Sequence, residues 1–195
     1  MPRSALPATV RAFAAADVGP DIRAALRPVM ERLRRLGAPV RWVAEPNWHL
    51  TVKFLGDVES RQLGGIGQAV REAAAEVAVF EMGLRGLHAF PPGRNPRIVA
   101  ADVTAGVEGL RALHAKLEAR LQAFGVAAEQ RAFLAHLTLG RVQGRGDLER
   151  LWKAAAEHAQ DDFGTVTVGE IVLFQSELRP EGARYTPLVT AKLRS

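Results

Sequence analysis

One tripeptide, His-Leu-Thr, occurs twice in this chain of 195 residues, at positions 49–51 and again at 136–138. The composition predicts roughly 0.02 such tripeptides by chance, so two copies are a specific signal. Each copy lies in a short segment of apolar and β-branched residues, which favours a β-strand. The chain is therefore expected to contain two equivalent strands, one in each half.

Alternation along these strands separates a polar face from an apolar one, because successive side chains of a strand point to opposite sides. In the first strand the expected apolar face is Trp48, Leu50, Val52 and Phe54, and the expected polar face is His49, Thr51 and Lys53. In the second strand His136 and Thr138 lie opposite Leu137 and Leu139. Each strand thus presents an imidazole and a hydroxyl side by side.

The remaining pattern predicts a mixture of helices and strands in one compact body. Helical spacing of apolar residues occurs at 21–36, 60–77, 107–124 and 148–158. Strand-like segments lie at 9–15, 79–87, 97–103, 165–175 and 184–192. Strands and helices follow a similar order twice with no long linker, which predicts two intertwined lobes of a single domain over residues 1–195.

Composition limits the chemistry more than it identifies a partner. The absence of cysteine excludes disulfides, thiol nucleophiles and zinc-thiolate sites. A net charge of +5 favours a polyanionic partner, although most of the basic residues are arginine, which codon bias in a GC-rich genome also produces. The short apolar runs predict no membrane span and no secretory signal, so we expect a cytoplasmic protein with no membrane partner.

The two His-Thr pairs match the needs of phosphodiester opening. That reaction requires a base for the attacking oxygen, an acid for the leaving oxygen and donors for the non-bridging oxygens. Imidazole has an ordinary pKa near neutrality, so one copy can be neutral while the other is protonated. Two alternatives are a satisfied polar patch and a zinc site. No carboxylate or third histidine keeps a fixed spacing with the pair, which argues against a metal site.

At these residues the sequence resembles the 2H phosphoesterase superfamily, and within it the RNA 2′,3′-cyclic phosphodiesterases, which are named also for a 2′-5′ RNA ligase activity. The resemblance covers nearly the whole chain, in the blocks 11–17, 41–56, 131–141 and 173–185. Two positions depart from the family pattern: Ala100 replaces a usual Trp, and Ala135 replaces a usual Pro. Neither departure removes a catalytic group, so both bear on substrate preference.

The resemblance implies a bilobal α+β fold, with two pseudo-symmetric lobes whose antiparallel sheets line a central cleft and whose helices lie outside. It implies that His49 is the proton donor, that His136 is the proton acceptor, and that Thr51 and Thr138 hold the phosphate oxygens. The two motifs alone do not distinguish acid from base. Water attack would give RNA with a 2′-phosphate end, without metal or cofactor, and ligation to a 5′-hydroxyl strand would be the reverse reaction.

The sequence also indicates further candidate binding residues, a substrate and alternative activities. Arg131 and Arg141 flank the second motif and are candidates for phosphate binding, and Tyr185 is a candidate for base stacking. The expected partner is RNA with a 2′,3′-cyclic phosphate end, transfer RNA fragments included, with no obligate protein partner. The alternatives are hydrolysis of a small cyclic nucleotide or of ADP-ribose cyclic phosphate, and a non-catalytic module that binds RNA ends. Turnover of a cyclic phosphate end distinguishes an enzyme from the non-catalytic module.

Overall fold

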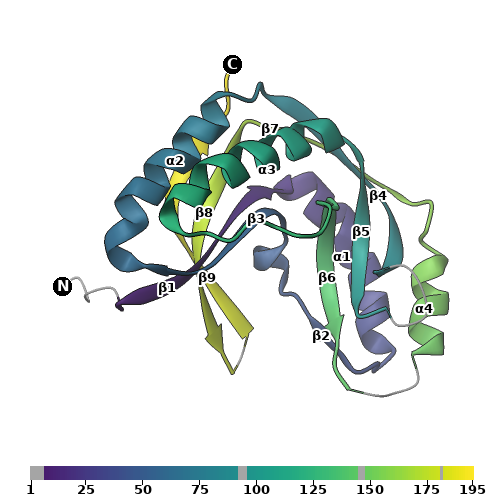
Figure 1. Cartoon of the computed structure of the whole chain (residues 1–195). Helices are drawn as coiled ribbons and strands as arrows, with labels where there is room; N and C mark the ends of the chain where they lie inside the picture. The colour runs from purple at the N-terminus through teal and green to yellow at the C-terminus, as the bar shows by residue number, and fades with distance from the viewer. Residues whose placement is uncertain (1–6, 92–95, 145–147, 181) are drawn as a thin grey trace.

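The computed structural model of the chain describes residues 7–91, 96–144, 148–180 and 182–195. Two antiparallel sheets lie side by side, and helices cover their outer faces (Figure 1). One sheet has the strand order β3-β1-β8-β9, and the other has the order β2-β6-β5-β4-β7. The chain passes between the sheets several times, because β1, β3, β8 and β9 belong to the first and the intervening strands to the second. The expected bilobal α+β architecture is confirmed.

The strands and helices have clear boundaries. The strands are β1 (Thr9–Asp17), β2 (Val40–Trp42), β3 (His49–Glu59), β4 (Phe80–Phe90), β5 (Ile98–Ala105), β6 (His136–Val142), β7 (Asp162–Val168), β8 (Glu170–Arg179) and β9 (Gly182–Lys192). The α-helices are α1 (Gly19–Arg35), α2 (Leu63–Ala75), α3 (Val107–Leu121) and α4 (Glu149–Ala156). Short 3-10 turns are η1 (Glu45–Asn47), η2 (Ser60–Gln62) and η3 (Gln122–Phe124).

Most of the expected elements are present, with two differences. The strand-like segment 165–175 is not one strand but parts of β7 and β8, because the chain turns at Gly169 between them. The second histidine strand begins at His136, and the residues before it have no regular secondary structure. Helices α2 and α3 pack on the first sheet, and α1 and α4 on the second.

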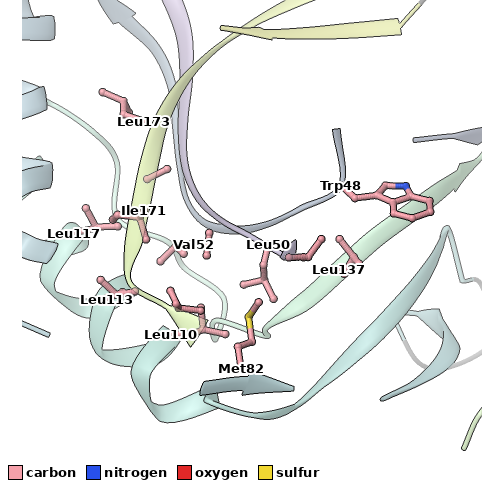
Figure 2. Close-up of a cluster of buried hydrophobic side chains, with 14 of the residues drawn as sticks. Trp48, Leu50, Val52, Met82, Leu110, Leu113, Leu117, Leu137, Ile171 and Leu173 are labelled. Carbon is pink, nitrogen blue, oxygen red and sulfur yellow. The ribbon is translucent and has the colours of Figure 1, made fainter. Parts of the chain in front are cut away.

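The two histidine strands lie at the junction of the sheets, where their apolar faces meet in the core. Leu50 and Val52 of β3 and Leu137 of β6 are at most 1% exposed. Figure 2 shows them together with Met82 and with three leucines of α3: Leu110, Leu113 and Leu117. Burial of such side chains stabilises the fold by about 1.5–3 kcal/mol each. This packing fixes the direction in which the polar faces of β3 and β6 point.

A buried ion pair holds the segment that leads into β6. Lys53 was expected beside His49, but its side chain is only 2% exposed and forms an ion pair with Glu118 of α3. The ammonium also donates to the carbonyl oxygen of Ala127 at 2.9 Å, and Glu118 accepts from the backbone N–H of Glu129 at 3.2 Å. The expectation that Lys53 shares the polar face of His49 was therefore wrong. The ion pair and these two hydrogen bonds join β3 and α3 to the irregular segment that contains Ala127 and Glu129.

Among the residues that the structure describes, no helix is both long enough and apolar enough to cross a membrane.

The Lys53–Glu118 pair predicts a large difference between two lysine substitutions. Lys53→Met leaves Glu118 partly buried without its cation, so it should lower the free energy of unfolding by about 3 kcal/mol. Lys116→Met removes a partner of Glu76 from a pair whose side chains are 45% and 37% exposed, and this should cost less than about 1 kcal/mol. Urea unfolding measures both variants. Equal losses would show that the Lys53 pair contributes no more than a surface pair.

Candidate active site

His49 lies at the start of β3, and its ring is held from both nitrogens. The Nδ1 atom is 2.7 Å from the carbonyl oxygen of Asn47, and Nε2 is 3.0 Å from Oγ1 of Thr51. A carbonyl oxygen can only accept, so Nδ1 carries the hydrogen, and in the neutral ring Nε2 is left as an acceptor. Arg23 of α1 donates to the carbonyl oxygen of Trp48 at 2.8 Å and also to that of Glu45. The turn that presents His49 is therefore fixed by backbone contacts.

His136 lies at the start of β6 in a matching environment. Its Nδ1 atom is 2.8 Å from the carbonyl oxygen of Leu134, again two residues earlier. Each imidazole also stacks on a phenylalanine from a neighbouring part of its sheet. Phe13 lies 4.8 Å from His49, and Phe90 lies 4.3 Å from His136, between ring centroids. In both histidines Nδ1 is occupied by a carbonyl oxygen, so Nε2 is the ring nitrogen left for proton transfer.

Both histidine strands carry an irregularity in register just after the threonine. In the first sheet Ala15 pairs with Thr51 but Ala14 pairs with Lys53, so Val52 is an extra residue. In the second, Ala100 pairs with Thr138 but Val99 pairs with Gly140, so Leu139 is the extra residue. A bulge of this kind reverses the alternation beyond it and re-aims the next side chains. The two lobes therefore have the same bulge at the same position after the His-Leu-Thr motif.

The bulges bring one unexpected side chain, Phe54, and one expected side chain, Arg141, to the histidine faces. Phe54, expected in the core, is 53% exposed and pairs in register with Phe13, which stacks on His49. Arg141 takes the equivalent position in β6, three residues after Thr138. Opposite each threonine stands an alanine, Ala15 or Ala100, and both alanines are buried. Ala100 thus matches its counterpart in the other sheet.

Burial and positive charge lower the pKa of both imidazoles in the free protein. Burial lowers the pKa of His49 to about 4; the Asn47 carbonyl and Asp17 oppose this, whereas Arg23 and Arg141 add to it. Burial also lowers the pKa of His136, opposed by the Leu134 carbonyl and assisted by Arg141. Arg141 is the cation whose charge acts on both rings. An anion between the histidines would offset this charge and favour protonation of one ring.

Comparison with known proteins agrees with this geometry. The family model of the 2′-5′ RNA ligase superfamily matches residues 18–179. The chain belongs to the 2′-5′ RNA ligase superfamily. It is 33% identical to an RNA 2′,3′-cyclic phosphodiesterase of Aeropyrum pernix, over 87% of this chain and 96% of that one. It is also 33% identical to one of Methanothermobacter thermautotrophicus, over 94% of this chain and 99% of that one.

Solved structures of similar proteins share the architecture. The protein TT0787 of Thermus thermophilus superposes with a TM-score of 0.79 at 28% identity, covering 94% of this chain and 98% of that one. LigT of E. coli in its apo form gives a TM-score of 0.77 at 23% identity, over 97% of this chain and all of that one. The resemblance to the 2H phosphoesterases seen in the sequence is confirmed, and so is the fold that it implied.

The other predicted site residues lie either near the histidines or in the irregular segment before β6. Tyr185 of β9 lies edge-on to His49, with ring centroids 5.2 Å apart, and burial raises the pKa of its hydroxyl. The charge of Arg141 acts on Tyr185 as it does on both histidines. Arg131 has a different position. It lies in the irregular segment before β6 and lines a hollow beside Phe54.

Three site features were not recognised in the sequence. Arg41 of β2 pairs in register with Arg141, so two arginines lie opposite each other, an arrangement that costs stability unless an anion is bound. Phe13 backs His49 from another strand. Asp102 pairs in register with His136, and its carboxylate lies 3.2 Å from Nδ1 of His88 without hydrogen-bond geometry. Each depends on strand pairing, which a single sequence does not show.

Among the described residues no group of three potential ligands could hold a metal ion.

The electrostatics predict how the histidines titrate. Imidazole nitrogen NMR should show His49 protonating near pH 4, well below the ordinary value, and neutral with hydrogen on Nδ1 above it. Arg141→Gln removes a positive charge that opposes protonation, so the pKa of both His49 and His136 should rise. Arg71→Gln, on the outer helix α2, is the control and should change neither. Titration of His49 at its ordinary pKa, with no response to Arg141→Gln, would contradict this account of the site.

Proposed function

We propose that this chain hydrolyses the 2′,3′-cyclic phosphate ends of RNA to 2′-phosphate ends. The observation that carries the proposal is the pair of matched imidazoles, each with Nδ1 bound to a carbonyl oxygen, Nε2 directed away from it and a threonine two residues on. The curated relatives named above are RNA 2′,3′-cyclic phosphodiesterases and match over nearly their whole length. The catalysed reaction is hydrolysis of a phosphoric diester.

His136 would accept the proton and His49 would donate one. Nε2 of His136 takes a proton from water as the water oxygen bonds to phosphorus. Nε2 of His49, protonated once the anionic substrate is bound, gives its proton to the 3′ oxygen as the bond from phosphorus to that oxygen breaks. Afterwards the proton on His136 returns through solvent to His49. The assignment of donor and acceptor follows the superfamily, since the two environments are nearly symmetric.

Hydrogen bonds and charge would stabilise the phosphorane-like transition state. Thr51 and Thr138 would donate from their hydroxyls to the non-bridging oxygens. Arg141, with Arg41 beside it, supplies positive charge. Tyr185 would stack or pack against the terminal base. The same site, with an RNA 5′-hydroxyl in place of water as the nucleophile, would join two strands by a 2′-5′ bond as the bond from phosphorus to the 3′ oxygen breaks.

The two lobes would act as one domain over residues 1–195, because His49 and His136 come from different sheets and neither lobe has the full set of groups. Fragments of transfer RNA are candidate substrates, and no protein partner is required by this chemistry. A cytoplasmic location remains a prediction of the sequence. A non-catalytic module that binds RNA ends would leave the cyclic phosphate intact, so turnover of such an end excludes it.

Removal of either imidazole should abolish most of the activity. His49→Ala leaves the leaving oxygen without its acid, and His136→Ala leaves water without its base; each should lower kcat at least about 100-fold. Turnover of an oligoribonucleotide with a cyclic end measures the loss, with circular dichroism to confirm folding. His158→Ala, after α4, is the matched control and should turn over normally. Near-parental turnover in either site variant would refute the mechanism.

Activity should not depend on a metal ion. The two imidazoles move the protons, and the threonines and Arg141 supply the electrostatic stabilisation that a Lewis acid would otherwise give. We expect kcat/KM to be unchanged after exhaustive treatment with EDTA and dialysis into metal-free buffer. Loss of activity that zinc or manganese restores would place the histidines in a metal site instead.

A further inference from the structure

Phe54 is a large aromatic side chain held on the histidine face of β3, although its neighbours in sequence are buried. It is 53% exposed, while Lys53 and Leu55 on either side are 3% and 7% exposed. The bulge at Val52 is the cause, because regular alternation from Leu50 and Val52 would bury Phe54 in the core. The fold thus exposes a phenyl ring next to its candidate catalytic residue, at a cost in hydrophobic burial.

A continuous row of aromatic rings joins this side chain to His49. The ring centroid of Phe13 lies 4.8 Å from that of His49 and 6.2 Å from that of Phe54. Phe54 is therefore one ring further from the reacting centre than Phe13. Phe13 is only 3% exposed, so Phe54 is the ring of this row that a base can reach. Exposed aromatic side chains are the usual platform for bases of single-stranded nucleic acid, because every base has a face that can stack.

A hollow of about 440 Å³ opens beside Phe54, between β3 and residues 127–131. This volume is within the range of small-ligand sites. Its wall has no regular secondary structure, yet Lys53 and Glu118 hold it at Ala127 and Glu129 through the buried ion pair. Buried charges are costly, so their use to fix this wall indicates that its position matters.

The polar lining suits a nucleotide. Arg131 lines the hollow and is exposed, and it forms no ion pair with any residue in the described ranges. Its guanidinium is free to bind a phosphate of the strand. Gln130 and Glu129 also line the hollow and carry donors and acceptors for a base edge or a ribose hydroxyl. An aromatic face with a nearby free cation is the combination found in sites for single strands.

We propose that Phe54 and this hollow bind the second nucleotide of the RNA strand, the one before the nucleotide with the cyclic phosphate. Phe54 stacks on its base, and Arg131 contacts a backbone phosphate. The proposal rests on the proposed function and adds a substrate preference to it. Strands of two or more nucleotides are better substrates than single cyclic nucleotides, which separates this enzyme from one that acts on small cyclic nucleotides.

The test compares two substrates: adenosine 2′,3′-cyclic phosphate, and a diadenosine with the same cyclic end. In the parent protein kcat/KM should be at least about tenfold higher for the dinucleotide. Phe54→Ala should reduce this ratio at least about fivefold, the lower end of the range for loss of one base–aromatic stack. Phe54→Trp should preserve the ratio. Arg131→Ala should lower it in a way that weakens with added salt, since the contact is with a phosphate.

Two controls isolate stacking from general damage. Leu36→Ala removes a side chain of similar exposure at the end of α1 and should keep the parental ratio. A dinucleotide that lacks the penultimate base should show no dependence of kcat/KM on Phe54. The proposal is overturned if the parent shows no preference for the dinucleotide, or if Phe54→Ala keeps the full preference.

A binding measurement separates failure of this proposal from failure of the proposed function. If the parent opened neither substrate, the assigned reaction would be wrong, but the subsite would still be decided by calorimetry. Adenosine 2′-phosphate and the diadenosine that ends in a 2′-phosphate are the probes. Tighter binding of the dinucleotide, lost in Phe54→Ala, supports the subsite, whereas equal affinities for the two probes overturn it.

Discussion

The packing of β3 against β6 at the junction of the sheets is the constraint on which the site depends. Leu50 and Val52 from one strand and Leu137 from the other share one core with α3 (Figure 2). Because strand side chains alternate, burial of these residues sends His49 and His136 to the opposite side. One hydrophobic contact thus positions two catalytic candidates that are 87 residues apart in sequence.

The contacts that position each imidazole are repeated in the two lobes. A carbonyl oxygen two residues earlier holds Nδ1, a phenyl ring backs the imidazole, and an alanine faces the adjacent threonine. The lobes differ after the bulge, where one has Phe54 and the other has Arg141. Arg141 lowers the pKa of both histidines in the free protein, so the negative charge of a phosphate would offset its effect. At this position one lobe therefore has a cation and the other has an aromatic side chain.

The sequence predicted the repeated motif, the main helices, the bilobal fold and the placement of Tyr185 and Arg141 near the histidines. It did not predict the exposure of Phe54, the burial of Lys53 or the pairing of Arg41 with Arg141. These depend on the register between strands, and one extra residue in a strand reverses every later side chain. Alternation read along a single strand assumes that no such residue exists, so it failed at Val52. Arg131 was assigned by its closeness to the motif, but the irregular segment takes it to the hollow beside Phe54.

The most direct test of the account is the position of the phosphate in the product. If one phosphate lies between the two Nε2 atoms, with acid and base on fixed sides, only one of its two ring bonds can break with assistance. An oligoribonucleotide with a 2′,3′-cyclic end should therefore give 2′-phosphate ends alone, as separated by chromatography against both authentic isomers. Intact cyclic ends, 3′-phosphate ends or a mixture of the two isomers would contradict the account.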